Sequence, residues 1–247
     1  MPPWWSGHWL GLHAASGQAP DIMPLPLTRY GLRELLLATA GCGLAGALAV
    51  WLCWPVAIVP AAVWLWVLWF FRDPPRRSPA QTGVFLAPAD GRVTDITPIG
   101  ADSELGRDGV NIGVFMSIFD VHVNRSPAAG VVEKIDHRRG AFLDVRDPLA
   151  WQRNESATIR MACSRGGRAY PVVVRQVAGL IARRIVTDLT VGQELLAGGR
   201  IGMIKFGSRL ELMVPAELIG RVRVRVGQSV RAGLTVMVAQ PGEADNA

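Results

Sequence analysis

Residues 35–71 decide how the chain is organised: they read LLLATAGCGLAGALAVWLCWPVAIVPAAVWLWVLWFF, 37 residues without Asp, Glu, Lys or Arg. A straight helix of this length would measure about 55 Å, nearly twice the hydrocarbon thickness of a bilayer, so the segment must fold back. Pro55 and Pro60 mark the bend, because proline lacks the backbone donor and disfavours helix in the residue before it. We therefore expect a membrane-associated helical hairpin with arms at residues 35–54 and 61–71, and both a shallow re-entrant hairpin and two full spans remain open.

Basic residues flank this segment on both sides. Arg29 and Arg33 precede it, whereas Arg72, Arg76 and Arg77 follow it. Lysine and arginine are enriched on the cytoplasmic side of membrane segments. We therefore expect both ends of the hairpin, and the domain that follows it, on the cytoplasmic side of the cell (inner) membrane.

The rest of the composition indicates which kind of molecule the protein binds. The net charge of +6 comes almost wholly from arginine, because Lys134 and Lys205 are the only lysines. Arginine suits phosphate groups, but no zinc-finger spacing, recognition-helix pattern or aromatic RNA-binding signature is present. Beside a membrane segment we expect anionic phospholipid, and not nucleic acid, as the partner. The three cysteines have neither disulfide-framework nor metal-ligand spacing, so we expect a reducing compartment and no metal site.

The sequence before and after the hairpin has a different character. Residues 1–28 show no periodicity and are expected to form a flexible extension, in which Met23 is an alternative start. The hairpin then takes residues 29–72. Residues 73–247 consist of short β-type runs separated by Gly, Pro and Asp, which predict a mainly β domain. Strands are predicted at residues 84–87, 92–97, 110–117, 119–124, 130–136, 157–162, 169–177, 200–204, 210–214, 221–226 and 235–239.

Two internal repeats indicate the type of β fold. The motif VGQ followed by AG, at residues 191–198, recurs 35 residues later at 226–233. The motif PADG at 88–91 recurs 39 residues later as PAAG at 127–130. Such turn-and-strand repeats resemble the barrel-sandwich domains of the biotinyl/lipoyl type. We therefore expect a sandwich or barrel of short strands.

Three side chains are candidates for chemistry. Asp90 belongs to an Asp-Gly pair, which is typical of a hairpin turn. In the predicted strand around His122, alternation places Asp120, His122 and Asn124 on one face, either as a solvent-facing polar row or as part of a site. Ser208 follows a glycine, as serines in turns often do. Together Ser208, His122 and Asp90 match the nucleophile, base and orienting group of an acyl-transfer triad, although the G-x-S-x-G elbow of serine hydrolases is absent.

Four blocks, in order, resemble the signatures of the phosphatidylserine decarboxylase family. They are FFRDP at residues 70–74, APADG at 87–91, FDVHVNRSP at 119–127 and FGSR at 206–209. Longer members of the family carry Leu-Gly-Ser-Thr at the last block and a second histidine at the position of Phe119. In both features this chain is similar to the shorter branch of the family.

This resemblance implies that the domain is catalytic and that the chain processes itself. The cut would fall between Gly207 and Ser208 and leave a β chain of residues 1–207 and an α chain of residues 208–247. A homo-oligomer is compatible with the sequence, which leaves the oligomeric state open.

The resemblance also implies roles for the candidate residues. His122, oriented by Asp90, would take the proton from the Oγ atom of Ser208, which attacks the carbonyl of Gly207. Elimination from the resulting ester and hydrolysis would turn Ser208 into a covalent pyruvoyl group, the cofactor of the family. This group would form a Schiff base with phosphatidylserine, take up the electrons that remain when CO2 leaves, and release phosphatidylethanolamine.

Other residues are candidates for contacts with the lipid. Arg125, Arg138 and Arg139 are candidates for its phosphate, and the alternative is that they are solvated surface arginines without a function. We expect that the side chains of Phe142, Leu143, Leu149 and Trp151 either form a membrane-dipping loop or pack in the core.

Two other classes of protein remain as alternatives. A non-catalytic membrane-anchored adaptor on a lipoyl-like domain would carry its cofactor on a lysine at a hairpin tip, but neither Lys134 nor Lys205 lies in a Met-Lys or Asp-Lys turn. A membrane serine hydrolase with the same triad would keep Ser208 intact. Cleavage at Ser208 therefore separates the decarboxylase from both alternatives.

Overall fold

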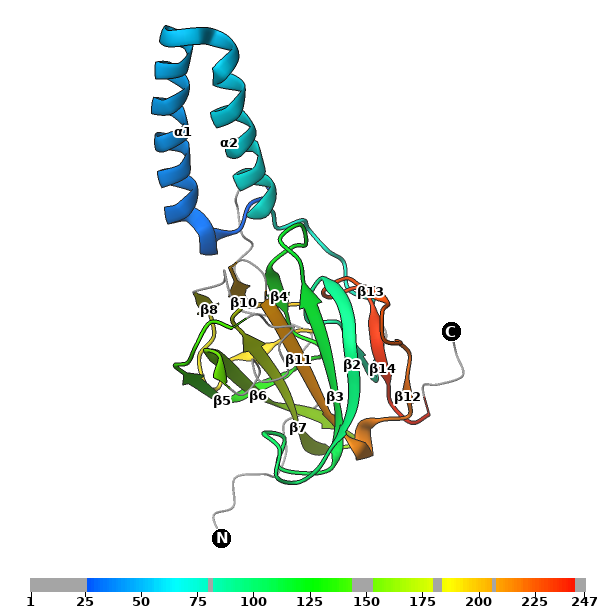
Figure 1. The fold of residues 1–247 in the computed structure, drawn as a ribbon. Coiled ribbons are helices and arrows are strands. Elements are labelled where there is room, and N and C mark those ends of the chain that lie inside the picture. Colours follow the sequence, from blue (N-terminus) through cyan, green and yellow to red (C-terminus); the bar gives the residue numbers. More distant parts are fainter. Residues whose placement is uncertain (1–25, 80–81, 144–152, 180–183, 206–207, 243–247) are drawn as a thin grey trace.

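The computed structural model describes residues 26–79, 82–143, 153–179, 184–205 and 208–242. A helical hairpin at the N-terminal side projects from a mainly β body (Figure 1). This arrangement confirms the predicted fold class. Among the residues singled out in the sequence, those outside the described ranges are Met23, Leu149, Trp151 and Gly207.

The hairpin consists of two antiparallel helices. Its elements, in chain order, are η1 (Arg29–Gly31), α1 (Leu32–Cys53), η2 (Trp54–Ala57) and α2 (Ile58–Phe70). Pro55 lies in η2, at the predicted bend. Pro60 instead lies in the first turn of α2, where a missing N–H is tolerated because the helix does not use it. The predicted start of the second arm at residue 61 is therefore slightly late.

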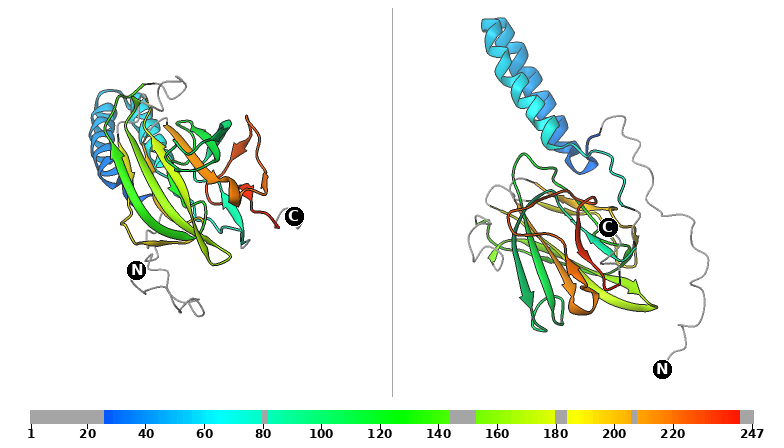
Figure 2. Two further views of the ribbon diagram at one scale, coloured as in Figure 1. Left: turned by 90° about the horizontal axis from the view of Figure 1, so that it is seen from below. Right: turned by 90° about the vertical axis from the view of Figure 1, so that its right-hand side faces the viewer.

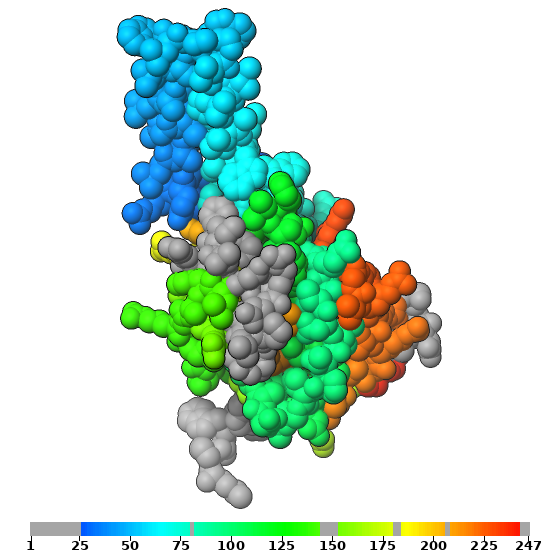
Figure 3. All heavy atoms as spheres, viewed as in Figure 1, coloured from blue at the N-terminus to red at the C-terminus, as the bar shows by residue number. Residues whose placement is uncertain are grey.

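The two arms differ in length and expose apolar side chains. The 22 residues of α1 rise about 33 Å, enough to cross the hydrocarbon core, whereas the 13 residues of α2 rise only about 20 Å. Among the described residues, Arg29–Phe70 is the one helical region long and apolar enough to span a membrane. The hairpin stands clear of the body (Figure 3), with exposed side chains that include Leu37, Leu44, Trp51 and Trp54. An exposed apolar surface of this kind is typical of membrane association.

Within the described ranges, the body contains fourteen strands and one short 3-10 turn. They are β1 (Val84–Leu86), β2 (Gly91–Ile99), β3 (Gly109–Met116), β4 (Val123–Arg125), β5 (Gly130–Arg138), β6 (Ser156–Arg165), β7 (Arg168–Val177), β8 (Ile185–Thr187), β9 (Glu194–Leu195), β10 (Arg200–Ile204), β11 (Ser208–Pro215), η3 (Ala216–Leu218), β12 (Arg221–Val222), β13 (Ser229–Val230) and β14 (Val236–Ala239). Eight strands form a curled antiparallel sheet in the order β13-β2-β3-β11-β7-β6-β5-β9 (Figure 2). Two smaller sheets have the orders β1-β14-β12 and β4-β10-β8.

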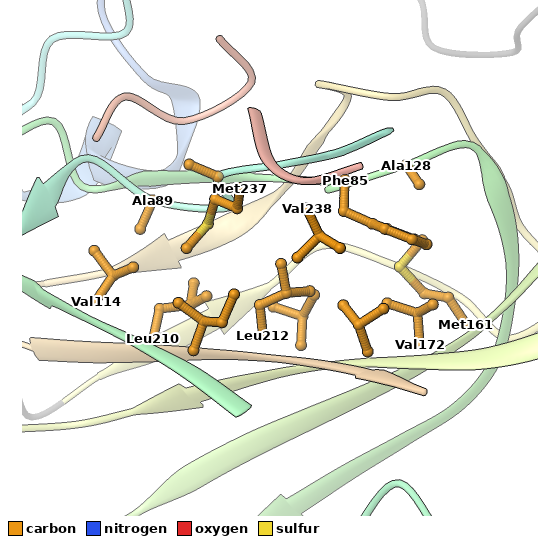
Figure 4. Close-up of a cluster of buried hydrophobic side chains, with 14 of the residues drawn as sticks. Phe85, Ala89, Val114, Ala128, Met161, Val172, Leu210, Leu212, Met237 and Val238 are labelled. Atoms are coloured by element: carbon orange, nitrogen blue, oxygen red, sulfur yellow. The ribbon is translucent and has the colours of Figure 1, made fainter. Parts of the chain in front are cut away.

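The core lies between the large sheet and the small sheet of β14. Along β11, Leu210 and Leu212 alternate toward this core, where they face Val238 of β14 and Phe85 of β1 (Figure 4). All four side chains are fully buried. Burial of this inner row fixes the register of β11, because a slip of one residue would turn the apolar side chains outward.

The predicted strand at residues 119–124 is wrong in its first half. The backbone N–H of Ser117 donates to Oδ2 of Asp120 (2.8 Å), and the N–H of Asp120 donates to the carbonyl of Ser117 (3.0 Å). This local turn uses the groups that a strand would pair across a sheet. The strand β4 therefore begins only at Val123, and the alternation predicted for Asp120 and His122 does not apply.

The internal repeats fold alike at the two ends of the large sheet. Gly192 and Gly227 both have positive φ, 87° and 86°, which glycine adopts without strain. The N–H of Gly192 donates to the carbonyl of Val132, and that of Gly227 to the carbonyl of Val93, both at 2.8 Å. The turns lead into β9, which pairs with β5, and β13, which pairs with β2. The body is thus built from two similar units around the central strands.

Candidate active site

The candidate site lies where the foot of the hairpin meets the body. The small sheet β4-β10-β8 occupies the end of the body nearest the helices (Figure 1). Met203 of β10 packs with Phe70 and Phe71 at the end of α2. The Phe70 ring also lies 4.3 Å from the ring of His122, measured between centroids. The hairpin therefore covers the predicted base with apolar side chains.

Two ion pairs fasten the foot of the hairpin. The Nζ atom of Lys205, just after β10, donates to Oε1 of Glu34 in the first turn of α1 (2.6 Å), and the Lys205 side chain is 6% exposed. Arg29 pairs with Asp188, which follows β8. These contacts connect the start of α1 to the segments on either side of β10, and thus to the residues just before Ser208.

His122 is fully buried, so its alternative interpretation as part of a solvent-facing polar row is wrong. Its Nδ1 atom lies 2.9 Å from the carbonyl oxygen of Asp120. Because a carbonyl can only accept, Nδ1 carries the proton and Nε2 is the unprotonated nitrogen. The Nε2 atom has no hydrogen-bond partner among the described residues. Burial lowers the pKa of His122 from 6.5 to about 4, so the ring is neutral at pH 7 and Nε2 can accept a proton.

Ser208 is the first residue of β11 and is fully buried. It pairs with Met116 at the end of β3, and its Oγ atom lies 3.5 Å from the sulfur of Met116. A thioether is a weak acceptor, so the hydroxyl is only weakly engaged. Asn124 Nδ2 approaches the same sulfur at 3.7 Å, and the N–H of Ile204 donates to the carbonyl of His122 (3.4 Å).

The structure thus brings Ser208 and His122 to one place without joining them directly. Both belong to segments that meet around Met116 and the end of β10. Within the described ranges, their side chains share no hydrogen bond. Proton transfer between them therefore requires the hydroxyl of Ser208 to turn from the sulfur toward Nε2.

Asp90 lies in the bend before β2, but the predicted hairpin turn is wrong, because β1 pairs with β14 and β2 pairs with β3 and β13. The contacts of Asp90 also differ from those that the resemblance implies. Both carboxylate oxygens pair with the guanidinium of Arg76, and the N–H of Ala232 donates to Oδ1 (2.7 Å). The described contacts of His122 show its orienting hydrogen bond going to the Asp120 carbonyl, and not to Asp90. The charge of Asp90 nevertheless raises the pKa of His122 against the larger opposite effect of burial.

Arg125 is not a surface arginine, and it is already paired. It is 5% exposed. Its Nη2 atom donates to Oδ1 of Asp73 (2.7 Å), and Nη1 donates to the carbonyl of Gly198 (3.1 Å). Asp73 also binds Arg200. The alternative of Arg125 as a solvated side chain is therefore wrong, because β4 places it against the segment that follows the hairpin. Its role as a phosphate ligand stays a prediction.

The two other predicted phosphate ligands lie away from the site. Arg138 ends β5 and Arg139 follows it, and both are exposed. In the order β11-β7-β6-β5, Arg138 is three strands from β11, or about 14 Å at the usual strand spacing. Phe142 packs against Ala178 and Ile204, which favours core packing for this residue over a place in the membrane.

Arg209 was noted in the sequence only as a departure from the longer family members. Its guanidinium binds both carboxylate oxygens of Asp95 (2.6 and 2.8 Å) and also donates to Glu211 (2.9 Å). A Cβ atom on Gly113 would lie 2.3 Å from Arg209 Nη2, so only glycine leaves room there. This cluster fixes the residue next to Ser208 to the outer face of the sheet. In the sequence, this cluster was indicated only by arginine at position 209, where longer family members carry threonine.

The arrangement suits acid–base chemistry at a serine, and metal binding lacks support. Among the residues that the structure describes, no group of three His, Cys, Asp or Glu side chains lies close enough to hold a metal ion. Ser208 and His122 instead offer a weakly bound hydroxyl and a neutral, buried base. These are the groups that an attack on a neighbouring carbonyl requires.

Comparisons with known proteins agree with this chemistry. A family model described as phosphatidylserine decarboxylase matches residues 64–238. A phosphatidylserine decarboxylase proenzyme of Rhodopirellula baltica is 38% identical over 213 residues, which cover 86% of this chain and 87% of that protein. One of Symbiobacterium thermophilum is 39% identical over 216 residues, or 85% and 98% of the two chains. One of Geobacter sulfurreducens is 43% identical over 179 residues, or 72% and 79%.

The matched region includes the three residues predicted to be catalytic. It begins within α2 and ends in β14, and so includes Asp90, His122 and Ser208. The relatives are named as proenzymes, which are enzymes made in a form that requires processing. These findings confirm the predicted family and favour the enzyme over the adaptor. The chain belongs to the phosphatidylserine decarboxylase family.

Proposed function

We propose that this chain decarboxylates phosphatidylserine to phosphatidylethanolamine and CO2, after cutting itself between Gly207 and Ser208. One observation carries the proposal: His122 is buried and neutral, its Nε2 atom has no partner among the described residues, and its segment meets the start of β11 through Asn124 and Ser208, which both approach the sulfur of Met116. A histidine in this state has no structural use for Nε2, but it can act as a base.

In the cleavage step, His122 Nε2 takes the proton of Ser208 Oγ, and the oxygen attacks the carbonyl carbon of Gly207. The Gly207–Ser208 peptide bond is replaced by an ester, and the nitrogen of Ser208 becomes the new amine. His122 carries a positive charge until it returns this proton to the leaving nitrogen of Ser208, and the carboxylate of Asp90 stabilises that charge at longer range. The Asp120 carbonyl keeps the ring oriented throughout.

The position of Ser208 fits a pyruvoyl group at the start of the α chain. After the cut, β11 remains hydrogen-bonded on both sides, to β3 and β7. The α chain also supplies β13, which pairs with β2, and β14, which pairs with β1. The two chains therefore stay together, and the new terminus stays buried. The pyruvoyl group supplies an electron-withdrawing carbonyl that stabilises the charge formed as CO2 leaves.

The hairpin supports a lipid substrate. Its foot lies against His122, so a headgroup reaches the site from the membrane surface without leaving the bilayer. Arg29 and Arg72 lie at this foot. Under the positive-inside rule, they support a position of the body on the cytoplasmic side of the inner membrane.

Denaturing electrophoresis and mass spectrometry of the purified protein test the proposal. The expected result is a small fragment with the mass of residues 208–247 and a blocked N-terminus. Ser208→Ala should abolish the fragment, whereas Ser229→Ala, which changes an exposed serine of β13, should leave it unchanged. An intact wild-type chain, as expected for a serine hydrolase or an adaptor, would refute the proposal.

A second experiment tests the substrate. Sodium cyanoborohydride should attach phosphatidylserine covalently to the processed α chain, and the same treatment should not label Ser208→Ala. Phosphatidylcholine, which has no primary amine, is the matched negative control. Processed protein that is not labelled and releases no CO2 would contradict the assignment of the substrate.

A further inference from the structure

Of the three arginines predicted to bind the lipid phosphate, Arg125 is paired with Asp73, and Arg138 and Arg139 lie at the end of β5, three strands from β11. We propose that Arg72, at the foot of α2, binds the phosphodiester of the lipid headgroup and so sets the serine moiety against His122. The inference rests on the proposed function and deepens it, because it names the group that the site recognises.

The guanidinium of Arg72 is held in a fixed orientation. Its Nη1 atom donates to the carbonyl of Trp69 (2.8 Å), and its Nη2 atom donates to the carbonyl of Phe119 (2.7 Å). Its central carbon lies 4.1 Å from the centre of the Trp69 ring. Two carbonyls and an aromatic face therefore position the group, although Arg72 is only partly buried.

Among the described residues, Arg72 forms no direct ion pair, although the charges of Asp90 and Asp120 act on it at longer range and raise its pKa against the larger lowering by burial. Arg76 binds Asp90, Arg125 binds Asp73, and Arg209 binds Asp95. In the part of the chain that the structure describes, the contacts of Arg72 are with carbonyls and a ring, and not with a carboxylate. A guanidinium has five N–H donors, so about three remain for a ligand. An oriented cation with spare donors is suited to an oxyanion, and arginine binds phosphate with two parallel hydrogen bonds.

The same loop holds Arg72 and the predicted base. Arg72 donates to the carbonyl of Phe119, and His122 donates to the carbonyl of the next residue, Asp120. A ligand whose phosphate lies on Arg72 therefore has its serine portion near His122. The positive charge of Arg72 also lowers the pKa of His122, which indicates that the two groups interact electrostatically.

The position of Arg72 matches the depth of a headgroup in the membrane. Trp69 is 56% exposed and Phe119 is 63% exposed, and both flank the arginine. Aromatic side chains gather at the level of lipid headgroups. The phosphate of a phospholipid whose chains lie along the hairpin is therefore expected at this height.

The test compares Arg72→Gln with Arg72→Lys and with Arg77→Gln, which removes an exposed arginine five residues later. All variants should be cleaved fully, as seen on a denaturing gel. With phosphatidylserine in neutral detergent micelles, Arg72→Gln should raise KM roughly tenfold and change kcat little, because a hydrogen-bonded charge is lost from binding. Arg72→Lys should recover part of the loss. An unchanged KM, or an equal rise in Arg77→Gln, would overturn the inference.

Soluble ligands separate headgroup recognition from attraction to the membrane. Glycerophosphoserine, the headgroup without acyl chains, should inhibit the wild type, and its inhibition constant should rise roughly tenfold in Arg72→Gln. Inorganic phosphate should inhibit both proteins equally weakly. If Arg72→Gln loses only its binding to anionic vesicles and keeps its inhibition by glycerophosphoserine, the arginine is a membrane contact and the inference fails. Failure of the wild type to cleave would instead refute the proposed function.

Discussion

The two ends of the large sheet are built alike, but only one of the two repeated turns carries a carboxylate, that of Asp90. One repeated turn leads into β2 and the other leads into β5. The turns also bind each other reciprocally: the N–H of Leu86 donates to the carbonyl of Pro127 (2.8 Å), and the N–H of Arg125 donates to the carbonyl of Pro88 (2.9 Å). The same backbone pattern is therefore satisfied twice, once on each side of the core.

The side chains in these turns are where the two ends differ. Asp90 is buried and binds Arg76, whereas Ala129, 39 residues later, is exposed and has only a methyl group. By the same spacing, the counterpart of His122 is Gly83. A turn that forms with alanine does not require a carboxylate. The fold of the turn therefore does not require the Asp90–Arg76 ion pair, which is present at only one of the two repeated turns.

Copying one end onto the other should have the largest effect. Asp90→Ala gives the first turn the sequence of the second and leaves Arg76, whose side chain is 7% exposed, without its carboxylate. We expect the free energy of unfolding to fall by about 3 kcal/mol. Self-cleavage should also slow, because Asp90 raises the pKa of His122 and its loss leaves His122 a weaker base. Urea unfolding of the uncleaved Ser208→Ala background, and a gel time course of the cleavable chain, measure the two effects.

The reverse substitution is the matched control. Ala129→Asp places a carboxylate in the exposed turn, where it has no buried arginine to neutralise, so the stability should change by less than about 0.5 kcal/mol. Cleavage should proceed at the wild-type rate. A large loss of stability in both variants would mean that the turns, and not the ion pair, are sensitive, and the comparison would fail.

The next largest effect is a pH dependence of the stability, which we attribute to His122. The pKa of His122 is about 4 in the folded chain and 6.5 in its ordinary state, so the unfolded chain binds the proton more readily. Stability should therefore fall as the pH falls from 6.5 to 4, by up to about 1.4 kcal/mol per pH unit. Urea titrations across this range should show a flatter profile in His122→Gln. The same change at His137, an exposed histidine of β5, should leave the profile unaltered.

The smallest effect should be equal at the two ends. Gly192 and Gly227 have positive φ and open space around their missing Cβ atoms, so the backbone conformation is the main cost of a side chain there. Gly192→Ala and Gly227→Ala should each lower the free energy of unfolding by about 1 kcal/mol without slowing cleavage. Unequal losses, measured by urea unfolding, would show that the two units are less alike than their hydrogen bonds indicate.

The hairpin and the repeat could be predicted because their signals are local. A charge-free run and a motif with fixed spacing are visible within a few tens of residues. The turn around Asp120 was missed because one side-chain hydrogen bond, from the backbone of Ser117, overrides the alternation of a strand. Strands β8, β9 and β13 were missed because two or three residues are too few to show a period.

The state of the site residues could not be read from the sequence. The burial of His122 depends on Phe70, which another element supplies. In the same way, Arg125 appeared available until the fold placed Asp73 beside it. Residue types and motifs therefore identified Ser208 and His122 as candidates, whereas their partners depend on tertiary contacts that no local pattern records.

The ion pair between Lys205 and Glu34 has a mechanical consequence. One end of this link belongs to the helix that is long enough to enter the membrane, and the other lies two residues before Gly207. A tilt of α1 relative to the body would therefore displace Lys205, which lies two residues before Gly207 at the proposed cleavage site. If the chain is cut at Gly207 as proposed, this ion pair would couple the orientation of α1 in the bilayer to the position of the cleaved bond.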